Sequence, residues 1–107
     1  MEINPYIFRE YDIRGLAEAE LTTEVAKAVG AAFGSYLGGS ATVTVGRDVR
    51  LSSQRLNGDF SAGVRGSGCD VIELGMVPTP LVYYSVGKLG ADASAAITGS
   101  HNPVEYN

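Results

Sequence analysis

The 107 residues, 45% of them hydrophobic, suffice for one small domain with a real core and exclude a multidomain architecture for the chain as it stands. The 12 acidic and 8 basic side chains give a formal net charge of -4, which disfavours a nonspecific binder of nucleic acid or of an acidic membrane surface. The single cysteine excludes an intrachain disulfide and a four-cysteine zinc site, and no signal peptide or membrane-spanning run is visible, so we expect a cytoplasmic protein.

The first part of the chain predicts a strand, a polar loop and a helix. β-forming side chains from Tyr6 to Arg9 precede the polar stretch YDIRG, which predicts a first strand that runs into a loop. Thr22 is the expected N-cap of a helix, with Glu24 in the first turn, where the helix dipole favours an anion. Gly38 ends this helix, whose apolar positions recur at helical spacing: Val25, Val29, Ala32, Phe33 and Tyr36.

The middle of the chain predicts a second strand and a second helix. Alternating TVTV, from Thr42 to Val45, reads as a strand that leads into GRDVRLS. Ser52 is the expected N-cap of the following helix, whose apolar positions Leu56, Phe60 and Val64 are spaced by four. Gly66 and Gly68 are expected to end that helix.

Two more strands and a third helix complete the pattern. The stretch from Cys69 to Leu74 predicts a third strand, and the small residues from Ala91 to Ile97 predict a fourth. Between them, Thr79 is the expected helix cap, with Pro80 in the first turn. This alternation predicts an α/β fold, a layered sheet of about four strands with crossover helices, in which the strands are usually parallel.

Polar loops that follow strands of an α/β sheet are its usual ligand sites, and three such loops occur here: YDIRG, GRDVR and TGSHNP. The last places Ser100 on a glycine-hinged turn, and arginines lie on the loops expected nearby: Arg9, Arg14, Arg47 and Arg50. Guanidinium groups bind phosphate in bidentate fashion, so the combination favours phosphate chemistry. The sequence has no hydrolase elbow, P-loop or GxGxxG motif, and one histidine cannot build a two-histidine metal site.

Local chemistry leaves plainer interpretations open. A serine between glycine and histidine is more often a turn residue than a nucleophile, and His101 could equally be a surface histidine. The arginines could form structural ion pairs with Asp12 and Asp48 instead of holding a ligand.

Four motifs in order, FREYDIRG, VGRDVRLS, GMVPTPLVYY and TGSHNPVEYN, resemble those of the N-terminal domain of α-D-phosphohexomutases, most closely the bacterial phosphomannomutase/phosphoglucomutase branch. The resemblance implies that residues 1–107 are the N-terminal part of domain I of a four-domain enzyme. That parent would interconvert glucose or mannose 1-phosphates and 6-phosphates through a phosphoserine and a hexose 1,6-bisphosphate. Phosphoglucosamine mutases typically carry a GTDGIRG-like start and a DN ending, and they are the alternative within the family.

The resemblance also implies roles for individual residues. Ser100 would carry the phosphoryl group, His101 and Asn102 would be catalytic neighbours on its loop, Arg14 would be a catalytic and substrate-binding cation, and Tyr11 would contact the substrate. Further residues would brace the cleft or shape the loop beside it: Arg47, Asp48, Thr79 and Pro80.

The family binds Mg²⁺ through the phosphoserine and the aspartates of a DGDGDR-type loop in the second domain, and this sequence contains no such loop. Ser100, through its phosphate, would be the one metal ligand among these residues, so we expect the 107 residues alone to be an inactive fragment. A binding module for phosphorylated ligands without turnover and a scaffold domain are the alternatives. Because the chain ends seven residues after Ser100 and terminal segments fray, we also expect a poorly anchored C-terminus.

Overall fold

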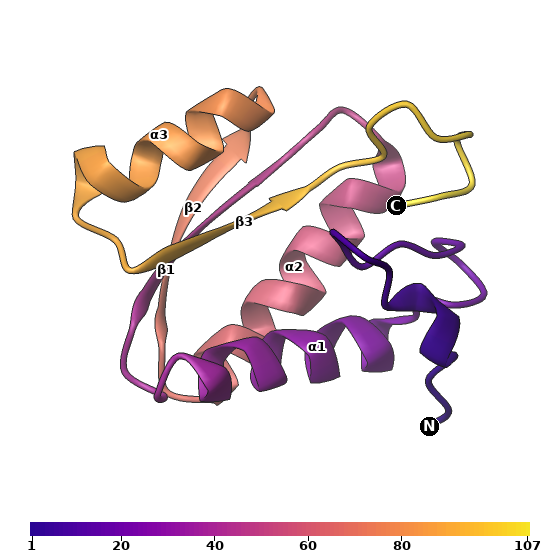
Figure 1. Cartoon of the computed structure of the whole chain (residues 1–107), viewed down its shortest axis with the longest axis horizontal. Coiled ribbons are helices and arrows are strands. Elements are labelled where there is room, and N and C mark those ends of the chain that lie inside the picture. The colour runs from indigo at the N-terminus through magenta and orange to yellow at the C-terminus, as the bar shows by residue number, and fades with distance from the viewer.

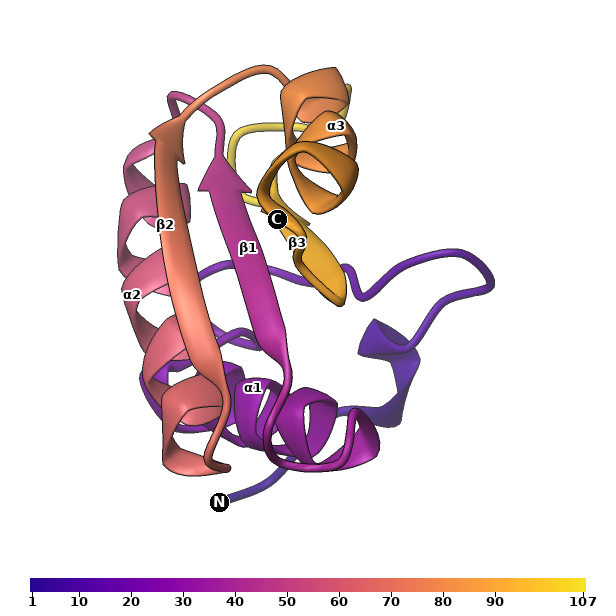
Figure 2. The ribbon, with the colours of Figure 1, turned by 90° about the vertical axis from the view of Figure 1, so that its left-hand side faces the viewer.

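A parallel three-stranded sheet forms the centre of the computed structural model, which describes all 107 residues. Its strands are β1 (Thr42–Arg47), β2 (Asp70–Met76) and β3 (Ala93–Ile97), in the order β2-β1-β3. β1 and β2 run side by side in the same direction in Figure 2. The predicted α/β class with parallel strands is confirmed, and the predicted number of about four strands is wrong, because the sheet has three.

Helices cover both faces of the sheet. α1 (Thr23–Tyr36) and α2 (Leu51–Gly66) pack together on one face, and α3 (Thr79–Leu89) lies on the other (Figure 1). Glycines bring α1 and α2 close together, since a Cβ atom at Gly30 would lie 2.1 Å from the carbonyl oxygen of Phe60. A Cβ atom at Gly63 would lie 2.0 Å from the carbonyl oxygen of Lys27. None of the helices is long and apolar enough to cross a membrane.

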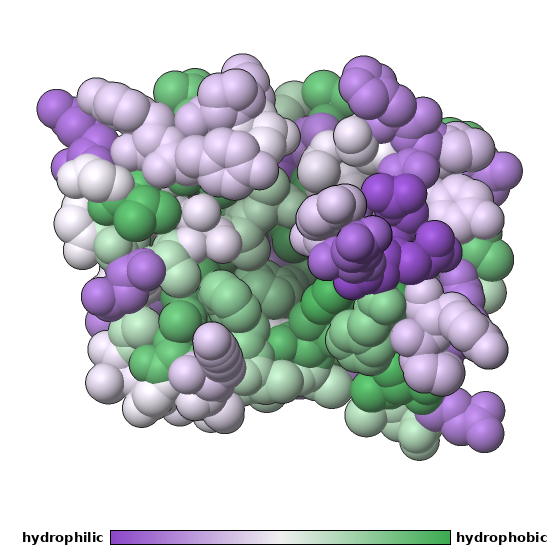
Figure 3. Space-filling view, viewed as in Figure 1, coloured by the Kyte–Doolittle hydropathy of each residue, from purple (hydrophilic) through white to green (hydrophobic).

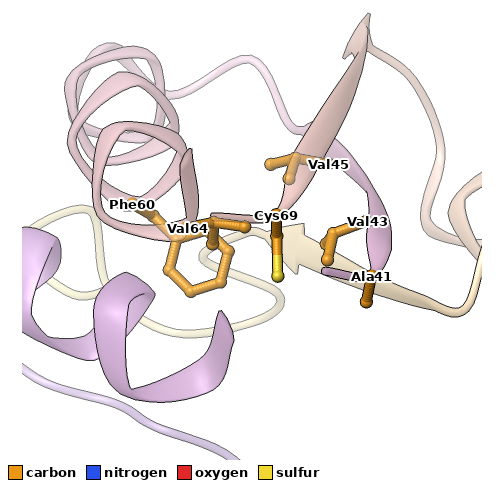
Figure 4. Packing of buried hydrophobic residues seen from close by; sticks show 6 residues of the cluster. All are labelled: Ala41, Val43, Val45, Phe60, Val64 and Cys69. Carbon is orange, nitrogen blue, oxygen red and sulfur yellow. The ribbon is translucent and has the colours of Figure 1, made fainter. Parts of the chain in front are cut away.

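The main hydrophobic core lies between β1 and α2. Val43 and Val45 are fully buried, and Phe60 and Val64 point from α2 toward them and toward Cys69 (Figure 4). Burial of such aliphatic and aromatic side chains contributes about 1.5–3 kcal/mol each, so this cluster holds the helix pair on the sheet. On the opposite face Thr44 and Ser85 share a hydrogen bond of 2.7 Å between their hydroxyl oxygens.

The predicted first strand, from Tyr6 to Arg9, is absent. Residues Pro5–Ile7 form a short 3₁₀ helix, η1, and the neighbouring backbone makes only an isolated antiparallel bridge between Phe8 and Ile13. Pro5 fixes φ and favours the first turn of a helix, and the Asn4 side chain caps this turn by accepting a hydrogen bond of 3.0 Å from the Tyr6 amide.

Helix caps agree with the sequence at α1 and differ at the other two helices. The Thr22 hydroxyl accepts a hydrogen bond of 3.2 Å from the Val25 amide, which confirms the predicted cap. At α2 the N-cap position is Arg50, without a side-chain cap, so the predicted Ser52 cap is wrong. At α3 the N-cap position is Pro78, so Thr79 is the first helical residue, and Pro80 lies in the first turn as expected.

The C-terminal segment is well anchored, which contradicts the expectation of a loose end. Asn107 is 7% exposed, and its backbone exchanges hydrogen bonds of 2.9 and 3.0 Å with Gly15. Leu16 and Tyr106 form an antiparallel bridge beside this pair. The N-terminal segment therefore supplies the backbone partners of the C-terminal residues, and the sequence near the C-terminus does not indicate them.

Candidate functional site

Two of the three predicted polar loops meet at the carboxyl ends of the parallel strands. The loop after β3, residues 98–107, lies against the junction between β1 and the N-terminal end of α2 (Figure 1). We call residues 98–107 the serine loop. Because β1 and β3 pair in parallel, both chains leave the sheet at the same end, and their loops must pass close to each other.

Ser100 lies at the tip of a tight turn within the serine loop. The carbonyl oxygen of Gly99 accepts hydrogen bonds from the backbone amide of Asn102 at 2.9 Å and from its side-chain Nδ2 at 3.0 Å. The Ser100 amide donates to the Thr98 hydroxyl at 2.9 Å. The φ angle of Ser100 is 50°, a left-handed conformation that costs a residue with a side chain roughly 1–2 kcal/mol.

This turn leaves the two side chains at its tip free. Ser100 and His101 are both exposed, and neither side chain makes a hydrogen bond or ion pair within the chain. A strained backbone that is held in place by its surroundings is common where a side chain must be presented in one direction. The arrangement offers a hydroxyl and an imidazole to an outside molecule.

Asp48, at the end of β1, ties this turn to the sheet. Its Oδ2 accepts hydrogen bonds from the Gly99 amide at 2.8 Å and from the Thr98 hydroxyl at 3.2 Å. Its Oδ1 accepts from the Ser53 hydroxyl at 2.5 Å and from the Arg50 amide at 3.1 Å. The carboxylate thus joins the start of α2 to the start of the serine loop.

The ionisation of Asp48 reflects these bonds. Partial burial raises the pKa of the carboxyl group, but hydrogen bonds from Ser53, Gly99, Arg50 and Thr98 together outweigh burial and hold the pKa below its ordinary value. Asp48 is therefore ionised at neutral pH, when it acts as an acceptor only.

Arg50 hydrogen-bonds to the rest of the serine loop. Its Nη1 donates to the carbonyl oxygens of Pro103 and Tyr106, both at 2.8 Å, and its Nη2 donates to that of Asn102 at 2.5 Å. Its Nε lies 3.8 Å from Asp48 Oδ2. The guanidinium of Arg50 is engaged by these protein acceptors, so the expectation that it lies free on a loop to hold phosphate is not supported.

The other expected cations are placed differently. Arg14 forms an ion pair of 2.9 Å with Asp12, and its Nε is buried without a partner. The neighbouring residue Gly15 pairs with Asn107, so the structure brings Arg14 beside the end of the serine loop. No hydrogen bond or ion pair joins Arg14 to Ser100.

Tyr11, Arg9 and Arg47 make no hydrogen bond to the serine turn. Tyr11 is 92% exposed on the N-terminal segment. Arg9 donates from Nε to the Tyr6 carbonyl oxygen at 2.7 Å, and Nη1 of Arg47 is buried without a partner. Asp48 accepts hydrogen bonds from Thr98 and Gly99, and its ion-pair partner is Arg50.

Several residues of this site were missed by sequence reasoning. Ser52 donates to Oδ1 of Asn107, whose Nδ2 donates to the Ser53 hydroxyl at 2.8 Å. Gly99 lets the Arg50 guanidinium approach the backbone of the turn, because a Cβ atom at this position would lie 1.8 Å from Cζ of Arg50. No local signal marks these partners, which lie about fifty residues apart in the chain; the GRDVRLS stretch only indicated that this loop was polar.

A large open groove lies beside β3, away from the serine hydroxyl. Its volume is about 750 Å³, and its lining is mostly hydrophobic, with contributions from the N-terminal segment, α1 and β3. Figure 3 shows a hollow with hydrophobic residues on this face. Thr98 and Asn107 line it, and Ser100 does not. Its apolar character does not suit a phosphorylated ligand, so the candidate anion site is the serine turn.

No group of three or more histidine, cysteine, aspartate or glutamate side chains is placed to hold a metal ion. Asp48 is the acidic residue that hydrogen-bonds to the serine turn, and both of its carboxylate oxygens already accept hydrogen bonds from protein donors. The residues present therefore offer Mg²⁺ no ready ligand set, since this ion prefers six oxygen ligands in octahedral geometry.

Comparison with known proteins extends the likeness to nearly the whole chain. Residues 5–107 match the family model for "Phosphoglucomutase/phosphomannomutase, alpha/beta/alpha domain I". A protein of Methanobrevibacter smithii named "Probable phosphoglucosamine mutase" is 48% identical over 101 residues, which cover 94% of this chain and 23% of that protein. A phosphomannomutase/phosphoglucomutase of Pseudomonas aeruginosa is 46% identical over 103 residues, which cover 94% of this chain and 22% of that protein.

A solved structure shares the fold. The phosphoglucomutase/phosphomannomutase family protein of Burkholderia thailandensis superposes with a TM-score of 0.88 at 41% identity, over 99% of this chain and 25% of that one. The chain thus spans about a quarter of the length of these relatives. Because the family model covers residues 5–107 and relatives share both sequence and fold with them, the chain belongs to the phosphoglucomutase/phosphomannomutase family.

Proposed function

We propose that these residues are the phosphoserine-bearing part of domain I of a cytoplasmic phosphohexomutase, with Ser100 as the phosphoryl carrier. The observation that carries the proposal is the serine turn, which exposes the Ser100 hydroxyl without any internal hydrogen bond while Asp48 and Arg50 hold the backbone around it. A scaffold would have no need of a strained, exposed serine that is held this firmly.

The proposed chemistry is a phosphoryl exchange between Ser100 and a hexose phosphate. A sugar hydroxyl attacks the phosphorus of phosphorylated Ser100, the bond from phosphorus to Oγ breaks, and the hydroxyl proton leaves to a base. The hexose 1,6-bisphosphate turns over, and Oγ then attacks its other phosphorus while the bond from that phosphorus to the sugar oxygen breaks. The base returns the proton to the sugar oxygen, and the serine is phosphorylated again. Each step depends mainly on positioning and charge stabilisation, as phosphoryl transfers generally do.

Other residues of the chain have supporting roles in the proposal. His101, the one histidine, lies next to Ser100, and an imidazole can accept or donate a proton near neutral pH. Asn102 closes the turn through the Gly99 carbonyl oxygen. Arg14 would neutralise charge on the transferring phosphoryl group, and Tyr11 would contact the sugar once the substrate spans the space between the N-terminal segment and the serine loop.

Mg²⁺ has no place in the steps assigned to this chain. A phosphate on Ser100 would be its one ligand here, which is too few for a magnesium ion, so the other ligands would come from outside residues 1–107. When bound, the ion would neutralise phosphate charge. We therefore expect the 107 residues alone to bind or carry phosphate at most, and the full-length parent to turn substrate over.

Two sugar specificities are candidates for the full-length parent. The YDIRG start and the YN ending favour glucose and mannose phosphates, whereas the Methanobrevibacter relative is named for glucosamine and is equally similar. The proposal is therefore a glucose/mannose enzyme, with a phosphoglucosamine mutase as the second candidate.

The test uses the full-length protein. Mass spectrometry is expected to find phosphate on Ser100, and Ser100→Ala is expected to abolish conversion of the 1-phosphates of glucose and mannose. Ser40→Ala, at an exposed loop serine before β1, is the matched control and should keep full activity. Glucosamine 1-phosphate assayed in parallel decides between the two specificities. Full activity of Ser100→Ala would contradict the proposal. Binding of hexose phosphates by the full-length protein without turnover would favour the binding module.

A further inference from the structure

Arg50 hydrogen-bonds to the serine loop but makes no hydrogen bond to the Ser100 hydroxyl or the His101 ring. Its guanidinium donates to three carbonyl oxygens of the serine loop, those of Asn102, Pro103 and Tyr106, and approaches Asp48 with its Nε. Its side chain is 16% exposed, and its bonds to Asn102 and Tyr106 are partly buried, whereas the bond to Pro103 is exposed. Hydrogen bonds from a charged donor in such a setting are stronger than neutral ones.

The guanidinium also packs against the backbone of the turn. A Cβ atom built at Gly99 would lie 1.8 to 2.2 Å from Cζ, Nε and Nη1 of Arg50, so the absence of a side chain at this position is what lets the group lie there. Gly99 directly precedes Ser100. The position of Arg50 and the conformation of the serine turn are therefore coupled sterically as well as through hydrogen bonds.

Lysine cannot replace this arrangement. An ammonium group is a compact point charge on a flexible stem, whereas the planar guanidinium presents donors in a fixed fork and can lie flat against a peptide. Three carbonyl oxygens from residues up to four positions apart in the chain need that fork. Replacement by lysine should keep the charge and lose the geometry.

We propose that Arg50 is a positioning residue for phosphoryl transfer at Ser100: together with Asp48 it keeps the serine loop in the single shape in which the hydroxyl can donate and accept the phosphoryl group. This inference rests on the proposed function of Ser100. Asp48 holds the residues before the serine, Thr98 and Gly99, and Arg50 holds those after it. The serine therefore sits between two fixed points.

The helix that Arg50 precedes, α2, offers a matched control. Arg55 also donates to two backbone carbonyl oxygens, those of Ala17 and Leu21, and pairs with the carboxylate of Asp59 at 3.2 Å. These partners belong to the N-terminal segment and to α2, not to the serine loop. Arg55→Lys should therefore reproduce the general cost of losing a half-buried arginine fork without disturbing Ser100.

The experiment compares Arg50→Lys, Gly99→Ala and Arg55→Lys in the full-length protein. The readouts are the rate at which glucose 1,6-bisphosphate phosphorylates Ser100, followed by mass spectrometry, kcat, KM and the melting temperature. We expect Arg50→Lys and Gly99→Ala to slow phosphorylation of Ser100 and to lower kcat by at least about tenfold, which is roughly 1.4 kcal/mol of barrier, with KM little changed. Arg55→Lys should change both rates less than about twofold, at a similar change in melting temperature.

The outcomes separate the inference from the proposed function. If the unaltered protein is not phosphorylated at Ser100, the proposed function fails. If it is phosphorylated and Arg50→Lys keeps its rates, the inference alone is overturned. It is also overturned if the loss in Arg50→Lys and Gly99→Ala merely follows the melting temperature in the way that Arg55→Lys does. Gly99→Ala keeps every donor of Arg50, so it reports on geometry even where a lysine is poorly tolerated.

Discussion

The serine loop and the groove beside β3 lie next to each other and are built by opposite means. No residue of the serine loop belongs to a hydrophobic core cluster, and Asp48 and Arg50 make hydrogen bonds to both halves of the loop. The groove is lined mostly by hydrophobic side chains, including exposed Phe8 and Tyr11, and stays open.

The difference shows how this fold fixes the backbone conformation of the serine loop but not that of the groove. Hydrogen bonds to a charged group are directional, so they can hold a backbone in one strained conformation such as that of Ser100. Apolar contact is not directional and scales with the area removed from water. The polar region is therefore the one suited to present a reacting group, and disturbing it should have the larger effect.

The largest expected effect comes from removal of the carboxylate at the centre of the polar region. Asp48→Ala removes the acceptor for Thr98, Gly99, Ser53 and the Arg50 amide and leaves their donors unpaired, so we expect a loss of about 3 kcal/mol in the free energy of unfolding. Urea denaturation measures it. Asp59→Ala, which breaks only the i,i+4 pair with Arg55, should cost about 0.5 kcal/mol. Equal losses in the two variants would show that Asp48 has no special role.

A smaller effect is expected at the end of the serine loop. Asn107→Ala removes the amide that joins Ser52 and Ser53, and should lower the free energy of unfolding by about 1–2 kcal/mol. Hydrogen exchange should rise at the Gly15 amide, which donates to the Asn107 carbonyl oxygen. Exposed Glu105 provides the control, because Glu105→Ala leaves the same backbone bonds in place. Unchanged exchange at Gly15 in Asn107→Ala would contradict the anchoring described here.

Acid should weaken the polar region selectively. The pKa of Asp48 is held below its ordinary value, so its contribution to stability is present in full above about pH 4 and is lost as the pH falls through the lowered pKa of the folded state. The stability difference between the unaltered chain and Asp48→Asn should therefore shrink on acidification. Urea denaturation at pH 7 and at several values below pH 4 tests the sign. A difference that grows toward low pH would be inconsistent with a lowered pKa.

The smallest effect on stability, with a clear effect on binding, is expected in the groove. Phe8 is 54% exposed, so Phe8→Ser should cost less than about 1 kcal/mol while reducing the fluorescence of a hydrophobic dye bound to the chain. Tyr83→Ser serves as the control, because Tyr83 is 67% exposed on α3 and does not line the groove. Equal dye binding by both variants would mean that the groove is not the exposed apolar surface the dye detects.

Elements with strong local patterns could be predicted from the sequence. The Thr22 cap with the helix after it, and the alternation in Thr42 to Val45, are set by residues close together in the chain, and both agree with the structure. The strand expected from Tyr6 to Arg9 is absent, because Pro5 and the Asn4 cap favour a short 3₁₀ helix there and β-forming side chains alone do not decide the backbone conformation. The expected Ser52 cap is absent for a tertiary reason, because the Ser52 hydroxyl donates to Asn107 instead of capping α2.

The sequence by itself determined the α/β class, the places of the three helices and the serine turn with its exposed hydroxyl, since each depends on capping, periodicity or turn chemistry within a few residues. Only the tertiary structure decided that Arg50 holds the serine loop and is not free for a ligand, that Gly99 must lack a side chain, and that Asn107 is anchored. The physical reason is that these bonds join residues about fifty positions apart or more, and parallel pairing of β1 with β3 is what brings them within reach.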